Sequence, residues 1–224
     1  MNRLSHLQNA LQSQFLYWYA TLLTRTARMR IDGKEHYQAA MNSGRSVVYS
    51  FWHQQTMPFV AFGNRHFDPT QFVVIVVGDE RGDTLGGLAK KLGAHLSARI
   101  DMQGNPMAAG RGVLNVIRQM EAGKYTMLAP DGPDGPAFEP KPGAVFLARK
   151  SGALIVPFGG WSRQAYQLRR WDRYLLPLPF ARLQLVFGEP IDPDKVKDRK
   201  QIRQLLVEQL NWVRDRARLL AGDD

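Results

Sequence analysis

The chain has 224 residues, no cysteine and a formal net charge of +10 at pH 7. This length suits one α/β domain, and a hydrophobic content of 44% is enough for a buried core and argues against disorder. The absence of cysteine excludes disulfides, thiolate metal sites and a cysteine nucleophile. The positive charge favours an anionic partner: nucleic acid, an anionic membrane or an acidic protein.

The N-terminal part of the chain predicts an amphipathic helix over residues 8–30. Its apolar residues recur at helical spacing: Leu11, Phe15, Trp18, Tyr19, Leu22 and Leu23. An aromatic face beside arginines suits a membrane surface, and the same face is equally suited to pack on the rest of the protein. No apolar run reaches the roughly 18 residues of a membrane-spanning helix. The first residues also lack the pattern of a signal peptide.

Strands and helices alternate after this segment. The expected strands are 46–51, 72–77, 125–129, 153–158 and 183–187, and the expected helices are 57–62, 84–92, 107–121, 143–150 and one that begins near Asp192 or Asp194. Continuous β-branched strands suit a sheet covered on both faces, so this order predicts a mostly parallel α/β fold with flanking helices. We predict one domain over 1–224, with an N-terminal helix in 1–30, a core in 45–192 and a C-terminal helix in 193–220.

His53 is the first candidate for chemistry because it directly follows the strand 46–51. Open α/β sheets bind ligands at the carboxyl ends of their strands, and histidine exchanges protons near neutral pH. A histidine in this setting is, taken alone, more often structural than catalytic. The interpretation of His53 therefore depends on the segments expected beside it.

Three loops follow other predicted strands. The loop 129–136 (APDGPDGP) is rich in Pro and Gly, which suits a rigid loop that aims Asp131 and Asp134 at one point, or an ordinary turn. The segment 93–99 (GAHLSAR) ends at Arg99, whose guanidinium suits either a phosphate or a surface salt bridge. The loop 78–83 (GDERGD) offers carboxylates to orient the His53 ring, as in a catalytic triad.

Together these blocks resemble the lysophospholipid acyltransferase superfamily, whose members have the glycerolipid acyltransferase fold. The blocks similar to the family are Trp52-His53, 93–99, 130–136 and 154–157. Trp171-Asp172-Arg173 and 176–180 (LPLPF) look like a small bacterial branch formerly catalogued as a domain of unknown function. One departure stands out: Pro58 occupies the position of the aspartate in the family pattern H-x-x-x-x-D.

The resemblance implies transfer of an acyl chain from a thioester, acyl-CoA or acyl carrier protein, to a hydroxyl of a lysophospholipid or related membrane lipid. It implies His53 as general base and Asp83 as its carboxylate partner, with Asp79 and Glu80 as alternatives. The substrate-binding residues it implies are Arg99, Asp131, Gly132 and Pro133. Asp131 is expected either to position the acceptor or to brace its loop. The reaction requires no metal and no cofactor beyond the thioester co-substrate.

The expected partners are a CoA thioester or acyl carrier protein and anionic membrane lipids, with no nucleic acid. The expected membrane-facing residues are Phe15, Trp18, Tyr19, Leu22 and Trp171. The arginine-rich segment 163–182 is expected to form either a membrane-facing loop or a β-hairpin with inward aromatics. We expect a peripheral protein at the cytoplasmic face of the inner membrane. The acceptor lipid and the oligomeric state stay open.

Two other classes of function compete with this one. A non-catalytic lipid-binding protein on the same fold is favoured by the missing aspartate at position 58. A nucleic-acid-binding protein is suggested by charge alone, since the basic residues form no single stripe and match no standard module. The glycine loops lack the G-x-x-x-x-G-K-[ST] pattern, which argues against a phosphate-loop nucleotidase.

Overall fold

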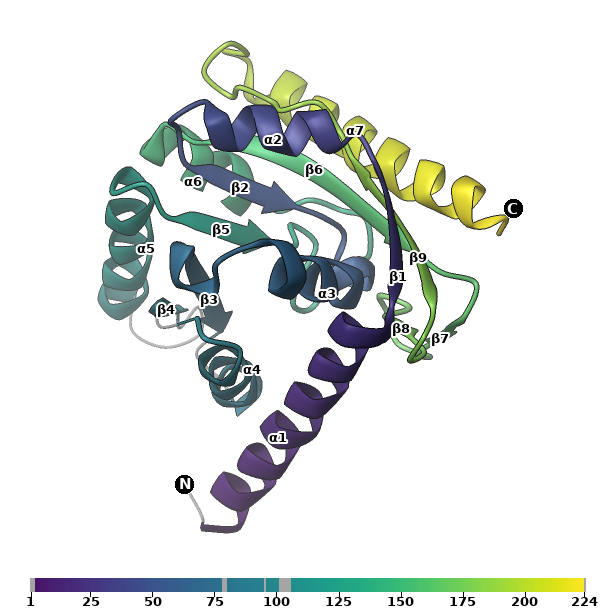
Figure 1. The fold of residues 1–224 in the computed structure, drawn as a ribbon. Helices are drawn as coiled ribbons and strands as arrows, with labels where there is room; N and C mark the ends of the chain where they lie inside the picture. Colours follow the sequence, from purple (N-terminus) through teal and green to yellow (C-terminus); the bar gives the residue numbers. More distant parts are fainter. Residues whose placement is uncertain (1–2, 78–79, 95, 101–105, 224) are drawn as a thin grey trace.

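The structure is a computed structural model that describes residues 3–77, 80–94, 96–100 and 106–223. Its centre is a seven-stranded sheet in the order β1-β9-β6-β2-β5-β3-β4 (Figure 1). The strands are β1 (Arg28–Asp32), β2 (Val47–Ser50), β3 (Phe72–Val77), β4 (Leu96–Ile100), β5 (Tyr125–Leu128), β6 (Leu154–Trp161) and β9 (Arg182–Phe187). All neighbours are parallel except β6 and β9. The predicted mostly parallel α/β fold is confirmed.

Helices cover both faces of this sheet. They are α1 (Arg3–Thr26), α2 (Lys34–Asn42), α3 (Thr56–His66), α4 (Glu80–Lys91), α5 (Pro106–Glu121), α6 (Gly143–Ser151) and α7 (Arg199–Ala221). Apolar residues of α1, α2 and α3 form the core on one face, which is rich in aromatic rings, and those of α5, α6 and α7 form the core on the other. Two short 3-10 turns, η1 (His53–Gln55) and η2 (Pro69–Gln71), precede α3 and β3.

Several predicted boundaries differ from the structure. The first helix ends at Thr26, and 28–32 forms β1, where Met29 pairs with Leu183 of β9. Met29 and Ile31 pack on the core and alternate with the exposed Arg28 and Arg30, so the sequence here has the period of a strand. The last helix begins at Arg199, because Asp198 caps it by accepting N–H bonds from the first helical turn. Asp192 instead forms a salt bridge with Arg45. The helix α2 was not predicted.

The helix α1 divides the predicted apolar face between two roles. Ala20 and Leu23 are buried, whereas an outer stripe is exposed: Leu11, Phe15, Trp18 and Leu22. Ser13 Oγ donates a hydrogen bond to the Thr84 carbonyl of α4, and a Cβ on Gly87 would lie 2.8 Å from that Oγ. Glycine at position 87 therefore permits the two helices to meet. Among the described residues, no helix is long and apolar enough to cross a membrane.

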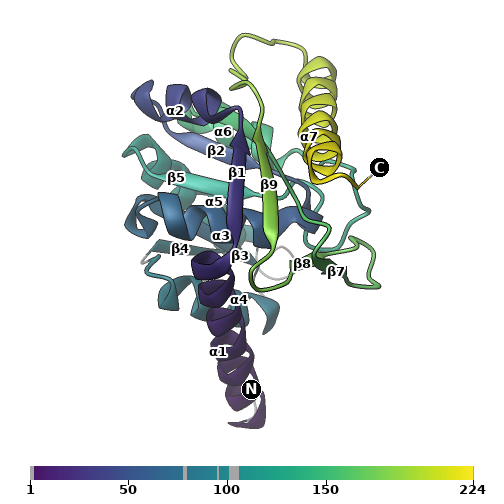
Figure 2. The same ribbon diagram turned by 45° about the vertical axis from the view of Figure 1, so that its right-hand side comes forward.

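A small antiparallel hairpin connects β6 to β9. It consists of β7 (Ala165–Gln167) and β8 (Leu175–Pro177). Of the two structures expected for the segment 163–182, a membrane-facing loop or a β-hairpin, the backbone thus forms the hairpin. The hydroxyl of Tyr19 donates a hydrogen bond to the Pro177 carbonyl, and the Phe180 N–H donates to Thr26 Oγ1. The hairpin is thus attached to α1, which extends from the body of the molecule with the N-terminus at its far end (Figures 1 and 2).

Candidate active site

The two central strands bring the first pair of site residues together. β2 and β5 are parallel neighbours in which Ser50 pairs with Leu128. His53 and Asp131 each lie three residues beyond these partners, so they meet at the same edge of the sheet. The His53 N–H donates to Asp131 Oδ1 at 2.9 Å, and the Phe138 N–H donates to Oδ2 at 3.1 Å.

Asp131 is a brace between the two loops. Its side chain is buried, and burial raises the pKa of Asp131 although both N–H bonds favour the carboxylate. Because Asp131 is 1% exposed and both of its oxygens accept backbone N–H bonds, the carboxylate connects the two loops from inside the protein. The sequence left two roles open for Asp131, and the geometry supports the brace.

The glycines of the same loop pack under the site. An added Cβ on Gly132 would lie 2.7 Å from Cδ2 of His53, so the loop backbone lies directly against the imidazole ring. The N–H groups of Gly132 and Gly135 donate to the carbonyls of Ala129 and Asp131, both at 3.1 Å. These two N–H groups are therefore engaged within the loop and not aimed at a reacting oxygen. Pro133 lies half-buried beside them.

The His53 ring is held by a carboxylate from the hairpin. Nδ1 lies 2.7 Å from Oδ2 of Asp172, whose side chain is fully buried. Asp172 Oδ1 accepts the Tyr174 N–H at 3.3 Å, and Arg170 Nη2 donates to Oδ2 at 3.0 Å. A carboxylate at Nδ1 keeps the proton on that nitrogen and leaves Nε2 as the proton acceptor. Within the described residues, Nε2 makes no hydrogen bond.

This arrangement corrects the predicted partner of His53. The structure places Asp172, and not Asp83, at Nδ1. Asp83 lies half-buried in α4, which begins at Glu80, so the second half of the predicted acidic loop is helical. Asp79 lies outside the described residues, as does the side chain of Glu80. The Trp171-Asp172-Arg173 motif was the only signal for Asp172, through the resemblance to the small bacterial branch.

Two further predictions concern Arg99 and Pro58. Arg99 lies in β4, next to Val76 of β3, and its side chain is outside the described part of the protein. Pro58 is buried on α3, and a Cβ on Gly160 of β6 would lie 2.4 Å from the Pro58 Cβ. The position that carries aspartate in the family pattern therefore packs against the sheet backbone here. The carboxylate beside the histidine comes instead from Asp172, which lies 119 residues further along the chain.

Aromatic rings enclose the imidazole. The ring centroid of Trp171 lies 5.4 Å from that of His53, and the ring of Tyr174 lies 5.6 Å away. Burial raises the pKa of Tyr174 to about 12, so its hydroxyl stays protonated. Trp171 also packs on Gly135, where an added Cβ would lie 2.7 Å from the indole. Trp171 thus covers the site and is half-buried, and half-buried Tyr19 bonds to the hairpin. The membrane-facing position of both residues stays a prediction.

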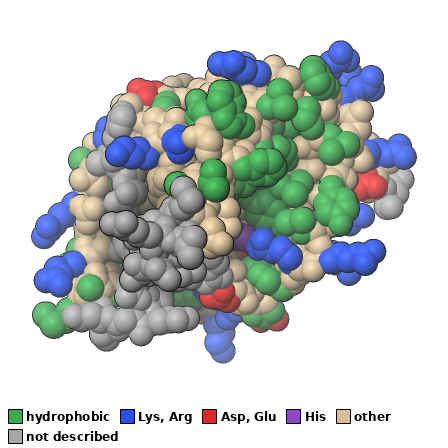
Figure 3. All heavy atoms as spheres, turned by 90° about the horizontal axis from the view of Figure 1, so that it is seen from below, with side chains coloured by type: hydrophobic (Ala, Val, Ile, Leu, Met, Phe, Trp, Pro, Cys, Tyr) green, Lys and Arg blue, Asp and Glu red, His purple; other side chains and the backbone are tan. Residues whose placement is uncertain are grey.

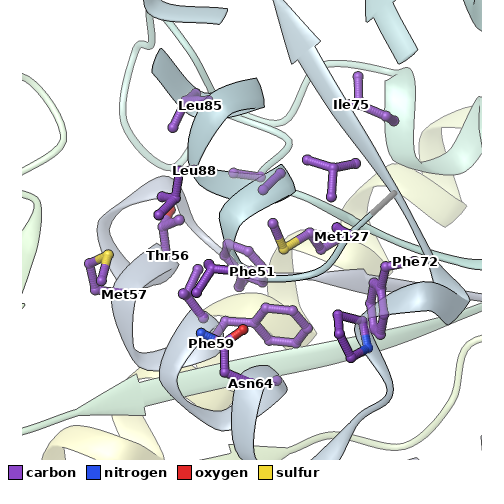
Figure 4. Close-up of a pocket in the computed structure, with 18 of the residues that line it drawn as sticks. Phe51, Thr56, Met57, Phe59, Asn64, Phe72, Ile75, Leu85, Leu88 and Met127 are labelled. Atoms are coloured by element: carbon purple, nitrogen blue, oxygen red, sulfur yellow. The ribbon is translucent and has the colours of Figure 1, made fainter. Parts of the chain in front are cut away.

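An apolar cavity of about 220 Å³ opens at His53. It lies between α3 and α4 over β3 and β5, and Figure 4 shows aromatic and aliphatic side chains converging on this space. One face of α3 lines the cavity from Thr56 to Asn64. The Thr56 hydroxyl donates a hydrogen bond to the His53 carbonyl. The eight steps from residue 56 to residue 64 correspond to a rise of about 12 Å along the helix. The apolar lining therefore extends along α3 from the residues beside the imidazole.

The fold and the site together define an α/β protein with a histidine–carboxylate pair at the mouth of an apolar pocket. PlsC, the 1-acyl-sn-glycerophosphate (LPA) acyltransferase of Thermotoga maritima, has a similar crystal structure, with a TM-score of 0.59 at 16% identity over 92% of this chain and 77% of that chain. The chain therefore has the lysophospholipid acyltransferase-like fold that the sequence blocks predicted.

Two sequence comparisons complete this picture. An uncharacterized protein of Rickettsia prowazekii (strain Madrid E) is 23% identical over 198 residues, which is 85% of this chain and 86% of that protein. No family model matches the chain. The likeness to PlsC thus rests on structure, and at this level of identity it extends to the fold alone.

The contact between Gly132 and His53 leads to a first testable prediction. Replacing Gly132 with alanine places a methyl group 2.7 Å from Cδ2, so the ring must shift from the position in which Nδ1 contacts Asp172. We expect the rate of the reaction proposed below to fall by about 10- to 100-fold, as misplaced catalytic groups typically do. Gly110→Ala in α5, where an added Cβ meets nothing within 4 Å, is the matched control and should keep full activity. Equal rates for both variants would show that the ring position does not limit the reaction.

Proposed function

We propose that this protein is an O-acyltransferase that moves a fatty acyl chain from a thioester to a hydroxyl group of a membrane lipid. The observation that carries this proposal is the position of His53, which is backed by buried Asp172 and faces an apolar pocket. A non-catalytic lipid-binding protein was favoured by the missing aspartate at position 58. Asp172 supplies a carboxylate to the same imidazole, so that argument no longer applies.

The proposed reaction uses both nitrogens of His53. Nε2 takes the proton of the acceptor hydroxyl as its oxygen attacks the thioester carbonyl, and Asp172 stabilises the resulting imidazolium through Nδ1. Collapse of the tetrahedral intermediate releases the thiolate, which recovers the proton from the imidazolium. An ester and a free thiol are formed, and the enzyme forms no covalent intermediate.

The pocket supports a long acyl chain as one part of the substrate. Its described walls are apolar apart from a few side chains, and the extent of its lining along α3 suits an extended hydrocarbon. We propose acyl-CoA or acyl carrier protein as the donor and a lysophospholipid or a related lipid as the acceptor. The name of the structurally similar PlsC gives 1-acyl-sn-glycerophosphate as the substrate of that protein.

The exposed stripe of α1 supports a position at a membrane surface. Phe15 and Trp18 are 73% and 62% exposed, and exposed Leu178 and Phe180 lie in the turn that is attached to the end of α1. Figure 3 shows the face from which α1 projects, where hydrophobic side chains gather and Lys and Arg lie around the edge. Apolar groups with a basic rim suit an anionic bilayer. We propose peripheral binding at the cytoplasmic face of the inner membrane.

The proposed function is tested with the purified full-length protein. Vesicles that contain lysophosphatidic acid, monoacylglycerol or another lysolipid are incubated with palmitoyl-CoA or palmitoyl-acyl carrier protein. Mass spectrometry then follows the diacylated product, and a thiol reagent follows release of the free thiol. Stoichiometric formation of ester and thiol supports the proposal, and thiol release without ester identifies a thioesterase instead.

The pocket gives a second prediction, about chain length. Gly63 lines the pocket, and a Cβ there meets only Phe67 Cδ2 at an ordinary 3.8 Å, so Gly63→Leu should fold and fill part of the space. Excluding two methylene groups costs ~1.6 kcal/mol, so we expect kcat/KM for a palmitoyl donor to fall about 10-fold or more. A butyryl donor should be unaffected. Gly110→Leu is the control, and a parallel loss for both donors would argue against an acyl pocket.

The outer stripe of α1 gives a third prediction. Phe15→Ser combined with Trp18→Ser removes exposed side chains, so the protein should stay folded while binding to anionic vesicles falls about 10- to 100-fold. Trp212→Ser on α7 removes another exposed tryptophan and serves as the control. Vesicle sedimentation measures binding. Unchanged binding of the double variant would place the membrane contact on another surface.

A further inference from the structure

Asp172 is shared by an imidazole and a guanidinium. The ring nitrogen Nδ1 of His53 and Nη2 of Arg170 both contact the same oxygen, Oδ2, at 2.7 and 3.0 Å. The carboxylate is fully buried, whereas the Arg170 side chain is 46% exposed. The guanidinium carbon also lies over the Tyr174 ring, 5.4 Å from its centroid. Within the described residues, the bond to Asp172 is the one hydrogen bond of the guanidinium, so its other N–H groups remain for a ligand beside the imidazole.

The shared oxygen has a consequence for charge. When His53 accepts a proton, an imidazolium and a guanidinium face a single carboxylate, so the cluster carries one excess positive charge. The surroundings are the rings of Trp171 and Tyr174, which screen charge less than water does. An anion on the outer N–H groups of Arg170 removes this excess. Such an anion therefore favours the state in which His53 holds the proton, and it does so during the reaction itself.

We propose that Arg170 binds the anionic group of the acceptor lipid and thereby couples acceptor charge to the histidine–aspartate pair. This proposal rests on the proposed acyltransferase function and assigns the acceptor's phosphate or carboxylate to a residue for which the sequence offered no role. The anion belongs to the acceptor because its hydroxyl must reach Nε2, and a lysophosphatidic acid carries its phosphate close to that hydroxyl. In acyl-CoA, the pantetheine arm separates the phosphates from the thioester.

A second basic group supports this location. Lys141 Nζ donates to the carbonyl of Gly132 at 3.0 Å, and Gly132 packs on the Cδ2 edge of His53. Lys141 is therefore attached to the loop that packs on the imidazole, and Arg170 to the carboxylate that holds the imidazole. Charged bonds of arginine to a phosphate oxygen are strong and directional, and the planar guanidinium can keep Asp172 on one side and an anion on the other.

The experiment compares two acceptors with the same acyl chain, lysophosphatidic acid and the neutral monoacylglycerol, in phosphatidylcholine vesicles. The donor is palmitoyl-CoA in one series and the phosphate-free palmitoyl thioester of N-acetylcysteamine in another. The variant is Arg170→Gln, and the control is Arg169→Gln, which removes the same charge from an exposed neighbour.

For Arg170→Gln we expect kcat/KM for lysophosphatidic acid to fall about 10- to 100-fold with either donor, as when a charged hydrogen bond is lost. For monoacylglycerol we expect less than a threefold change, and Arg169→Gln should change neither value by more than threefold.

The outcomes separate this proposal from the function on which it rests. Equal losses for both acceptors would overturn it, because they would show that Arg170 acts only by holding Asp172. Unchanged rates, or a loss confined to the palmitoyl-CoA series, would also overturn it, the latter by assigning the anion to the donor. If the wild-type protein acylates neither acceptor but acylates another lysolipid, the Arg170 assignment fails alone. If it acylates no lipid, the proposed function fails as well.

Discussion

Replacement of His53 by glutamine is expected to lower acyl transfer by about 10²- to 10⁴-fold while the protein remains folded. Glutamine cannot take a proton from the acceptor hydroxyl, so the chemical step loses its base. The His53 side chain is 23% exposed at the mouth of the pocket, and its backbone N–H bond to Asp131 does not depend on the side chain. The fold should therefore tolerate the change.

The measurement is the initial rate of ester formation, together with the melting temperature of each variant. His66→Gln is the matched control, because His66 is an exposed histidine at the end of α3 and does not line the pocket. Wild-type rates in His66→Gln and a large loss in His53→Gln would support the proposed base. Equal rates in wild type and His53→Gln would remove His53 from the mechanism.

Replacement of Asp172 by asparagine is expected to lower kcat by about 10²- to 10⁴-fold, since an amide at Nδ1 favours the wrong tautomer of the imidazole. Asp172 accepts bonds from His53, Arg170 and the Tyr174 N–H, and an asparagine offers a single acceptor oxygen. We therefore also expect the free energy of unfolding to fall by about 1–3 kcal/mol. Kinetics and chemical denaturation separate the two effects.

Asp83→Asn provides the comparison for this prediction. Asp83 is the carboxylate that the sequence favoured, and it lies in α4 while Asp172 occupies Nδ1. The Asp83 variant should keep kcat within about threefold of wild type, as removal of a group outside the pair usually does. The assignment of Asp172 would be reversed by the opposite pattern, a large loss for Asp83→Asn and none for Asp172→Asn.

The order of strands and helices could be predicted because it is a local property. The continuous apolar runs 72–77 and 125–129 correspond to β3 and β5, and the segment 107–121 corresponds to α5. Their hydrophobic period and length identify the element, and their alternation predicts a parallel sheet with covered faces. Residues 28–30 of β1 were misassigned to the first helix, because the alternation of this strand is short and directly continues a helical pattern.

The sequence also placed His53 and the loop 129–136 at one edge of the sheet. Both follow parallel strands, and parallel strands end at the same edge. The register of β2 and β5 then places His53 beside Asp131, where the His53 N–H donates to the carboxylate. This part of the site followed from local pattern and from one general rule of α/β sheets.

The partner of His53 was decided by the tertiary structure alone. Asp172 lies 119 residues further along the chain, in a hairpin loop whose sequence shows no period that fixes its position. The same limit applies to α1, whose periodicity defines an apolar face but not which of its residues contact α4, the hairpin or solvent. The sequence by itself thus determined the elements and the edge of the sheet that carries the histidine. Only packing between distant segments determined which carboxylate and which arginine meet there, because those contacts depend on the paths of loops and not on local spacing.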